Sequence, residues 1–171
     1  MVKEYSAVII IALVLIKLYL IGSSPDQQSV DQPAAQQTGD IRQQIVQTAL
    51  SQLGKPYVLG TRGPDTFDCS GFVQWVYKQH GIQIPDDTFS QQPALRDIRS
   101  VDLQPGDLIY EQFPTDQHVV MWMGDLDGNG TGDVINAGGY LDRGDDVNII
   151  YDFFENNPVF TEAIIGYRSV L

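Results

Sequence analysis

The chain has 171 residues, a length typical of a single globular domain. Ten Lys and Arg against 22 Asp and Glu give a formal net charge of −12, and phosphate backbones repel so acidic a protein, which argues against nucleic-acid binding. A hydrophobic fraction of 43% is enough for a compact core, which excludes disorder over most of the chain.

Residues 1–22 contain an apolar segment typical of protein export. The run AVIIIALVLI occupies residues 7–16 and continues to Ile21, interrupted by Lys17. An apolar core of about 15 residues is typical of a signal peptide and shorter than the about 20 residues of a membrane span. Lys17 can extend its ammonium group to the membrane surface, so a membrane anchor through residues 7–21 is a second interpretation. A buried helix of the globular domain is a third. We expect a protein exported to the cell envelope (periplasm or cell surface), either secreted or membrane-anchored.

A polar segment follows the apolar one. Residues 23–39, SSPDQQSVDQPAAQQTG, hold five Gln, two Pro and no aromatic residue. Such a composition buries too little apolar surface to order itself, so it predicts a flexible linker. The globular domain is then expected to span residues 40–171.

Three helices are predicted in the first half of that domain. Apolar residues recur at every fourth position over residues 40–53, with Asp40 or Thr38 as the expected N-cap. A second helix is expected over residues 69–80, and a short third helix over residues 88–95.

From residue 107 onward the pattern changes to short apolar segments separated by turn residues, which is typical of β-strands. Four strands are expected, at residues 107–111, 118–124, 133–137 and 164–170. Helices followed by strands predict an α+β domain.

Cys69 is the one cysteine in the sequence, which excludes an internal disulfide and a multi-cysteine zinc site. It stands in the motif FDCSG at the predicted start of the second helix. Unpaired N–H groups and the helix dipole stabilise a thiolate there and lower the pKa of the thiol. A buried structural cysteine is the alternative, but the neighbours Asp68 and Ser70 favour a polar, reactive site.

His118 and Asn136 complete a candidate catalytic group. A thiolate nucleophile needs an imidazole that holds the ion pair and later protonates the leaving amine. His118 opens a predicted strand, and Asn136, in the next strand, can orient the imidazole. Cys, His and Asn in this chain order match thiol proteases with a Cys-His-Asn site.

The segment GKPYVLGTRGPDTFDCSGFVQWVYKQHGIQIP, residues 54–85, resembles the NlpC family of bacterial cell-wall cysteine peptidases. Three further motifs follow in the family's order: LQPGDLIY at 103–110, HVVMWMG at 118–124 and VINAG at 134–138. The motifs are specific as a set rather than singly.

The resemblance implies a papain-like cysteine peptidase core, an α+β fold with N-terminal helices packed on a small antiparallel sheet. It also implies hydrolysis of peptidoglycan stem peptides, at the bond between γ-D-glutamate and the diamino acid, in cell-wall remodelling or lysis. Catalysis of this kind requires no cofactor. By motif position Cys69 is the nucleophile, His118 the base, and Asn136 occupies the position of a polar third residue that is His in many relatives.

Three more residues gain expected roles from the resemblance. Tyr57, in PYVLG, falls where the family places a tyrosine beside the thiol, and it is expected to bind the oxyanion together with the Cys69 N–H. Asp68 and Ser70 match positions that read the free amine of a stem peptide. Each has an alternative: Tyr57 as a core aromatic residue, and Asp68 with Ser70 as a helix cap.

Residues 125–133, DLDGNGTGD, form an insertion in a turn that is usually short in relatives. Oxygen-bearing side chains fall at positions 1, 3, 5 and 9 of a calcium-loop pattern, with a glycine at position 6: Asp125, Asp127, Asn129 and Asp133. Asn136 stands at position 12, where a bidentate Glu is expected. The pattern predicts a structural calcium ion, and a polar hairpin loop without an ion is the alternative.

We therefore expect a cysteine endopeptidase whose partners are peptidoglycan stem peptides and, if residues 1–22 are retained, the membrane. Two alternatives stay open. The same fold can serve an amidase or a lysis toxin, or the domain can be a non-catalytic module that binds wall peptides.

Overall fold

The computed structural model describes residues 34–138, 144–156 and 158–171. The predicted signal or anchor, residues 1–22, lies outside the described residues, as does the first part of the predicted linker. Pro33–Leu171 forms one compact unit. None of the helices in the described ranges combines the length and the apolar character that crossing a membrane requires.

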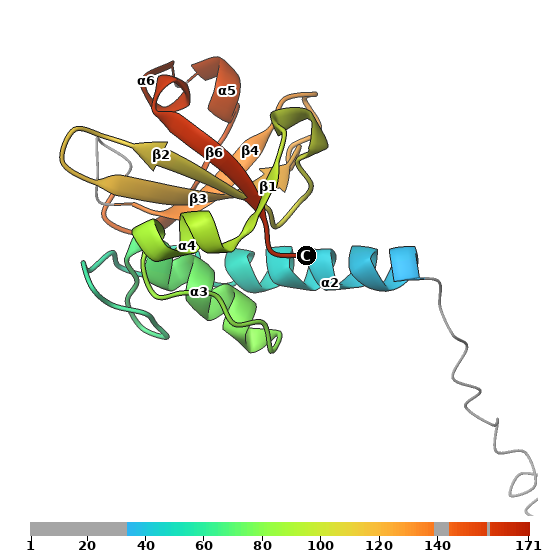
Figure 1. Ribbon diagram of the computed structural model, residues 1–171, viewed down its shortest axis with the longest axis horizontal. Helices are drawn as coiled ribbons and strands as arrows, with labels where there is room; N and C mark the ends of the chain where they lie inside the picture. Colours follow the sequence, from blue (N-terminus) through green and yellow to red (C-terminus); the bar gives the residue numbers. More distant parts are fainter. Residues whose placement is uncertain (1–33, 139–143, 157) are drawn as a thin grey trace, which may run out of the picture. The chain divides into compact units, whose positions relative to one another are not determined.

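An antiparallel sheet of six strands forms the centre of this unit (Figure 1), in the order β1–β6–β2–β3–β4–β5. The strands are β1 Arg96–Ile98, β2 Leu108–Gln112, β3 Gln117–Gly124, β4 Asp133–Ala137, β5 Val147–Ile150 and β6 Ile164–Ser169. The four predicted strands correspond to β2, β3, β4 and β6. The two edge strands, β1 and β5, were not predicted, because segments of three and four residues carry too little alternation to recognise.

The helices are α2 Ala34–Leu50, α3 Cys69–Gln79, α4 Thr88–Ala94, α5 Phe153–Asn156 and α6 Pro158–Glu162, with a 3₁₀ turn at Ser100–Asp102. The expected helix start near Asp40 is wrong, because α2 begins six residues earlier, at Ala34. Residues 34–39 of the predicted linker are therefore helical. Ala and Gln, which dominate this stretch, are good helix formers.

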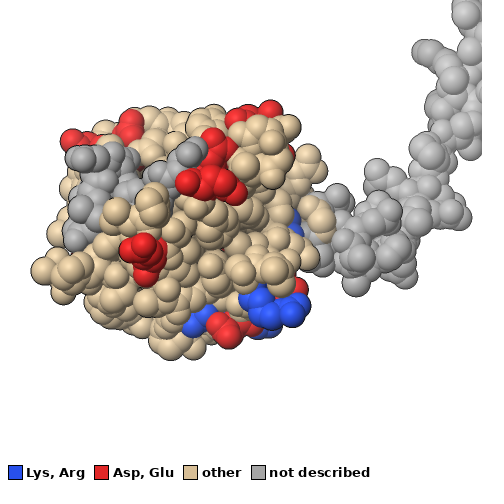
Figure 2. All heavy atoms as spheres, turned by 90° about the horizontal axis from the view of Figure 1, so that it is seen from above, with Lys and Arg blue, Asp and Glu red and all other residues tan. Residues whose placement is uncertain are grey.

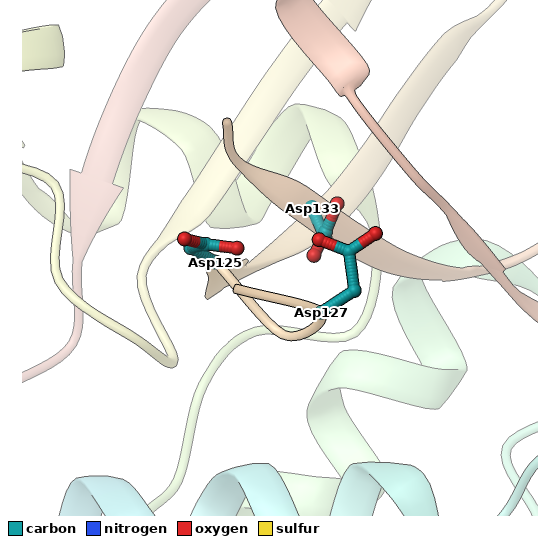
Figure 3. Close-up of side chains that lie close together, drawn as sticks. All are labelled: Asp125, Asp127 and Asp133. Atoms are coloured by element: carbon teal, nitrogen blue, oxygen red, sulfur yellow. The ribbon is translucent and has the colours of Figure 1, made fainter. Parts of the chain in front are cut away.

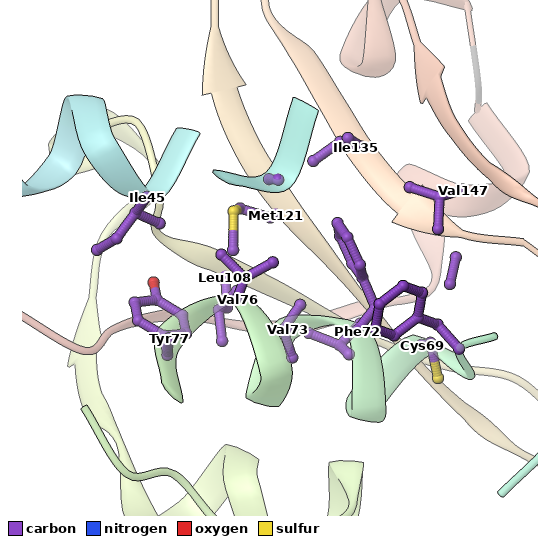
Figure 4. Close-up of a cluster of buried hydrophobic side chains, with 14 of the residues drawn as sticks. Ile45, Cys69, Phe72, Val73, Val76, Tyr77, Leu108, Met121, Ile135 and Val147 are labelled. Atoms are coloured by element: carbon purple, nitrogen blue, oxygen red, sulfur yellow. The ribbon is translucent and has the colours of Figure 1, made fainter. Parts of the chain in front are cut away.

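Helix α3 agrees with its predicted range and packs on β3 and β4, while α2 packs on α3. Its buried face forms the larger hydrophobic core together with side chains of the sheet (Figure 4), among them Phe72, Val76, Leu108, Met121 and Ile135. Cys69 lies at one end of this row of side chains. The core thus fixes the position of the helix whose first residue is the candidate nucleophile.

The opposite face of the sheet is also covered. Ile109, Val120, Val134 and Phe153 form a second, smaller buried cluster there. Because both faces are buried, every residue of β4 is inaccessible to solvent, including its polar members Asp133 and Asn136.

A buried ion pair joins α2 to the sheet. Nη1 of Arg42 lies 3.0 Å from Oδ1 of Asp107 and 2.9 Å from the carbonyl oxygen of Pro105. Oδ2 of Asp107 accepts a hydrogen bond from the backbone N–H of Gln104 at 2.9 Å. The aspartate of the PGDL motif therefore has a structural role, in the turn before β2.

Charged side chains are unevenly distributed on the face shown in Figure 2. Acidic side chains are scattered among uncharged ones, and the basic ones gather at one edge with acidic neighbours. Among the described residues, this face carries no broad basic surface.

Replacing Gly71, the glycine of DCSG, should destabilise the domain. A Cβ at this position would lie 2.2 Å from the carbonyl oxygen of Thr61 and 2.9 Å from Oδ1 of Asp68, so the backbone must move. We expect Gly71→Ala to lower the free energy of unfolding by about 2–3 kcal/mol in urea titrations. Gly39 is the matched control, because it is exposed on α2 and a Cβ added there would meet no atom within 4 Å. Gly39→Ala should stabilise by up to about 1 kcal/mol, and equal effects of the two changes would contradict the close contact.

Candidate active site

The loop before α3 folds back on itself and brings Tyr57 near the start of the helix. The backbone N–H of Val58 donates to the carbonyl of Phe67 at 2.9 Å, and the N–H of Phe67 donates to the carbonyl of Pro56 at 3.1 Å. Tyr57 and Phe67 form an isolated parallel bridge. Since Phe67 is two residues before Cys69, the PYVLG and FDCSG motifs lie side by side.

Asp68 is the N-cap of α3, as one of the two interpretations of its sequence position predicts. Its Oδ1 accepts from the backbone N–H of Gly71 at 2.6 Å and from Oγ of Ser70 at 3.1 Å. Its Oδ2 accepts from the N–H of Gly60 at 2.8 Å. One buried carboxylate therefore fixes both the loop and the first turn of the helix.

Cys69 is the first residue of α3 and is 9% exposed. Burial raises the pKa of its thiol to about 12, with the charge of Asp68 adding to the rise, whereas the backbone N–H groups of Val119 and Ser70 act to lower it. The pKa lowering expected from the helix N-terminus is therefore outweighed by desolvation. The thiol can lose its proton at neutral pH only to a neighbouring base.

Tyr57 is half-buried and packs against the core. Burial raises the pKa of its hydroxyl to about 12, and the nearby Cys69, Asp68 and Asp116 contribute in the same direction. The bridge of Tyr57 with Phe67 places Tyr57 beside the segment that leads into Cys69. A hydroxyl that stays protonated at neutral pH can donate a hydrogen bond beside the thiol.

His118 and Asn136 are brought together by the pairing of β3 with β4. Nε2 of His118 lies 3.1 Å from Oδ1 of Asn136, and both side chains are buried. The effect of the Val119 N–H on the Cys69 thiol places the sulfur next to the start of β3, where His118 stands. The structure thus gathers Cys69, His118 and Asn136 at one end of the sheet.

Gln91 supports the site but was not singled out in the sequence. Its Nε2 donates to the carbonyl of Ser70 at 3.1 Å and to that of Pro85 at 2.9 Å, and its Oε1 accepts from the hydroxyl of Tyr110 at 3.1 Å. The fully buried amide therefore joins α4, α3 and β2. A glutamine in a short helix carries no sequence signal for such a role.

The insertion 125–133 brings three carboxylates together (Figure 3). One carboxylate oxygen from each of Asp125, Asp127 and Asp133 lies within 4.8 Å of the other two. Asp133 is buried and also accepts from the backbone N–H of Leu126 at 2.7 Å, and Gly130 has the positive φ expected of the turn.

The two asparagines of the pattern have their amide oxygens engaged in hydrogen bonds. Oδ1 of Asn129 accepts from the backbone N–H and the hydroxyl of Thr131 at 2.8 and 2.6 Å, and Oδ1 of Asn136 lies 3.1 Å from Nε2 of His118. The donor set fits a hard cation in part, without the bidentate ligand of position 12. Calcium binding stays a prediction.

An α+β domain with a cysteine at a helix N-terminus, next to a strand whose histidine is bonded to an asparagine, has the architecture of papain-like cysteine hydrolases. The profile of the NlpC/P60 family matches residues 54–147. The chain therefore belongs to the NlpC/P60 family.

Relatives of this family carry enzyme names. Over 88 residues the chain is 39% identical to a probable endopeptidase of Mycobacterium tuberculosis, a match that covers 51% of this chain and 22% of the relative. The chain therefore spans about a fifth of that relative's length.

Solved structures agree with the fold. An NlpC/P60 family protein from Bacillus cereus matches with a TM-score of 0.65 and 31% identity, over 76% of this chain and 40% of that one. The peptidoglycan hydrolase RipB of Mycobacterium tuberculosis matches with a TM-score of 0.62 and 25% identity, over 82% of this chain and 69% of that one. RipD of the same organism is described as a non-catalytic domain protein adapted to peptidoglycan binding. It matches with a TM-score of 0.58 and 23% identity, over 77% of this chain and 98% of that one, a likeness that shows the fold alone.

Alkylation of Cys69 should depend on His118. A thiol with a pKa of about 12 is almost entirely protonated at neutral pH, so without a base its reaction with iodoacetamide should be slow at pH 7. In His118→Gln we expect the rate to rise about tenfold per pH unit between about pH 7 and 10. The unaltered protein should react faster at pH 7 and show a flatter profile. Mass spectrometry measures the rate, and the single cysteine makes the labelled position unambiguous.

His80→Gln is the matched control for this experiment, because His80 is the other histidine and lies at the opposite end of α3. It should react like the unaltered protein. A His118→Gln variant that reacts rapidly at pH 7, with the same flat profile as the unaltered protein, would show that the helix N-terminus ionises the thiol without the imidazole.

Calcium should raise the melting temperature if the loop binds it. Saturating calcium stabilises the folded state by about 1–3 kcal/mol at concentrations of about ten to a hundred times the dissociation constant. The shift should vanish with chelator and in Asp127→Ala, and persist in Asp65→Ala, which removes an exposed carboxylate elsewhere. The same melting curve with calcium and with chelator, in the unaltered protein, would discard the ion.

Proposed function

We propose that this domain is a cysteine endopeptidase that hydrolyses peptidoglycan stem peptides, with Cys69, His118 and Asn136 as its catalytic residues. The observation that carries the proposal is the buried hydrogen bond of 3.1 Å between Nε2 of His118 and Oδ1 of Asn136, beside the thiol at the start of α3. A histidine held in this way presents its other ring nitrogen, Nδ1, for proton transfer.

Proton transfer from the thiol to the imidazole starts the reaction. Because burial opposes an isolated thiolate, the thiolate forms together with the imidazolium of His118, and Asn136 stabilises that cation through its amide oxygen. The Cys69 sulfur attacks the scissile carbonyl carbon, and Nδ1 of His118 then gives its proton to the leaving amine. Water hydrolyses the resulting thioester, with His118 as the base.

The oxyanion of the tetrahedral intermediate needs two donors. The backbone N–H of Cys69 belongs to the first turn of α3, where N–H groups have no carbonyl partner within the helix. The hydroxyl of Tyr57 is the second donor, since its raised pKa keeps its proton in place.

The substrate bond is proposed from the family resemblance and the charge at the site. Asp68 is 7% exposed, and Ser70 is hydrogen-bonded to it. A carboxylate here attracts an ammonium group, which supports recognition of a free amine on the stem peptide and cleavage of the bond between γ-D-glutamate and the diamino acid. Capping of α3 and amine recognition are compatible roles for Asp68, because each carboxylate oxygen can accept two hydrogen bonds.

This function places the protein in the cell envelope, where peptidoglycan lies. The apolar segment at residues 7–21 supports export, as a cleaved signal or a retained membrane anchor. An amidase or lysis toxin would use the same Cys69, His118 and Asn136.

A non-catalytic wall-binding domain is the alternative from a different class. RipD shows that the fold supports such a protein. The presence of Cys69 with a bonded His118–Asn136 pair favours catalysis here, because a binding module has no use for a buried thiol next to an oriented base.

Digestion of purified peptidoglycan by the full chain tests the proposal. We expect new stem-peptide fragments, identified by chromatography and mass spectrometry, whose masses name the cleaved bond. Cys69→Ala should reduce their release by at least about a thousandfold. A folded chain that binds peptidoglycan in sedimentation assays but yields no fragment from several wall types would contradict the enzyme and support the binding module.

A further inference from the structure

An asparagine as the third catalytic residue has two unlike ends. Its amide can turn either Oδ1 or Nδ2 toward the histidine, and the two orientations have opposite chemical effects. With Oδ1 toward Nε2 of His118, the neutral ring carries its proton on Nε2, and Nδ1 can accept the thiol proton. With Nδ2 in that place, Nε2 has to be the acceptor and Nδ1 carries the proton, so the base is disabled. Something has to hold Asn136 in the first orientation.

The other end of Asn136 is engaged by Asn148 on β5. Nδ2 of Asn136 lies 3.1 Å from Oδ1 of Asn148 and 3.4 Å from its backbone carbonyl oxygen. The two residues are directly paired in the register of β4 and β5. Both partners of Nδ2 are oxygens, which requires the NH₂ group of Asn136 to point to Asn148 and its carbonyl oxygen to point to His118.

The side-chain amide of Asn148 can also adopt two orientations, and hydrogen bonds to Asp146 select one of them. Nδ2 of Asn148 donates to the backbone carbonyl of Asp146 at 3.1 Å and to its Oδ1 at 3.0 Å. A carbonyl and an ionised carboxylate can only accept hydrogen bonds. Asn148 must therefore turn its NH₂ group toward Asp146 and its oxygen toward Asn136. The direction of donation runs without ambiguity from His118 through the two amides to Asp146.

The segment that carries Asp146 is also tied to the other side of the site. Pro56 and Asp146 form an antiparallel bridge, and the backbone N–H of Tyr57 donates to the carbonyl of Asp145 at 2.7 Å. The backbone N–H of Gly138, after β4, donates to the carbonyl of Asp146 at 2.8 Å. The acceptor that directs the amides is thus held by the strand of Asn136 and by the segment of Tyr57.

We propose that Asn148 is a positioning residue of this site, directed by Asp146, which fixes Asn136 with its oxygen toward His118 and thereby keeps the proton of the neutral imidazole on Nε2. The catalytic consequence rests on the proposed function, since it concerns the ability of His118 to accept the thiol proton. The orientation itself is a property of the folded chain and is measurable without substrate.

Three variants of the full chain separate orientation from simple damage to β5. Asn148→Leu removes the oxygen that directs Asn136. The exchange Asp146→Asn with Asn148→Asp keeps an acceptor facing Asn136 and moves the carboxylate one place along the row. The control double variant, Asp145→Asn with Asn148→Asp, has the same net charge and also keeps an acceptor facing Asn136. It alters the exposed Asp145 and leaves two carboxylates facing each other, so it should melt at a lower temperature than the exchange variant.

The first measurement is the position of the imidazole proton by ¹⁵N NMR, in a Cys69→Ala background at about pH 8.5, about two pH units above the ordinary pKa of an imidazole. The chain has two histidines, and His80→Gln assigns the signals. We expect the proton of His118 on Nε2 in the parent and in the exchange variant, and a mixture of the two tautomers in Asn148→Leu. An unchanged His118 tautomer in a folded Asn148→Leu protein would overturn the proposal.

The second measurement is peptidoglycan hydrolysis in the Cys69 background. We expect Asn148→Leu to lower kcat about tenfold with KM unchanged, as for one hydrogen bond lost from the transition state. The exchange variant should recover most of the rate, because an acceptor faces Asn136 again. A rate for the exchange variant no higher than that of Asn148→Leu, or a change confined to KM, would contradict a positioning role. An inactive parent with the expected tautomers would instead count against the proposed function and leave the orientation intact.

Discussion

The buried carboxylate of Asp68 holds the candidate site together. It accepts hydrogen bonds from Gly60 in the loop and from Ser70 and Gly71 in the helix, so the two segments beside the thiol share one anchor. The close approach of Gly71 to the backbone of Thr61 depends on the same arrangement. A negative charge at a helix N-terminus is favourable, yet the same charge raises the pKa of the adjacent thiol. Asp68 thus fixes the position of Cys69 and at the same time makes the thiolate of Cys69 less stable.

That disadvantage explains why the histidine is indispensable to the proposed mechanism. Desolvation and Asp68 both oppose an isolated thiolate, so the sulfur becomes nucleophilic as one half of an ion pair. The sheet provides the other half, because β3 and β4 hold His118 and Asn136 in contact. Helix and sheet each contribute one partner, and the core between them, built around Phe72 and Met121, sets their separation.

Much of this arrangement could be predicted from the sequence. The motifs around Cys69 and the alternation in β3 and β4 are strong local signals, and they gave the helix, the strands and the paired His118 and Asn136. What failed depends on tertiary context. The early start of α2 at Ala34 comes from helix-forming residues in a stretch whose composition is typical of a linker. Whether the pKa of the Cys69 thiol is raised or lowered depends on burial, which a sequence motif does not encode. Asn148 is defined by the pairing of β5, an edge strand too short to recognise.

The hydrogen bonds that link His118, Asn136 and Asn148 also bear on how this site can change during evolution. A histidine in place of Asn136 would offer one N–H and one lone pair. Since Asn148 presents an oxygen toward this position, the N–H of an imidazole would turn to Asn148 and its lone pair would face the N–H on Nε2 of His118. The acceptor that Asn148 presents on β5 can therefore pair with an N–H of either asparagine or histidine at position 136. As far as the direction of hydrogen bonding is concerned, an exchange between asparagine and histidine at position 136 requires no change at Asn148.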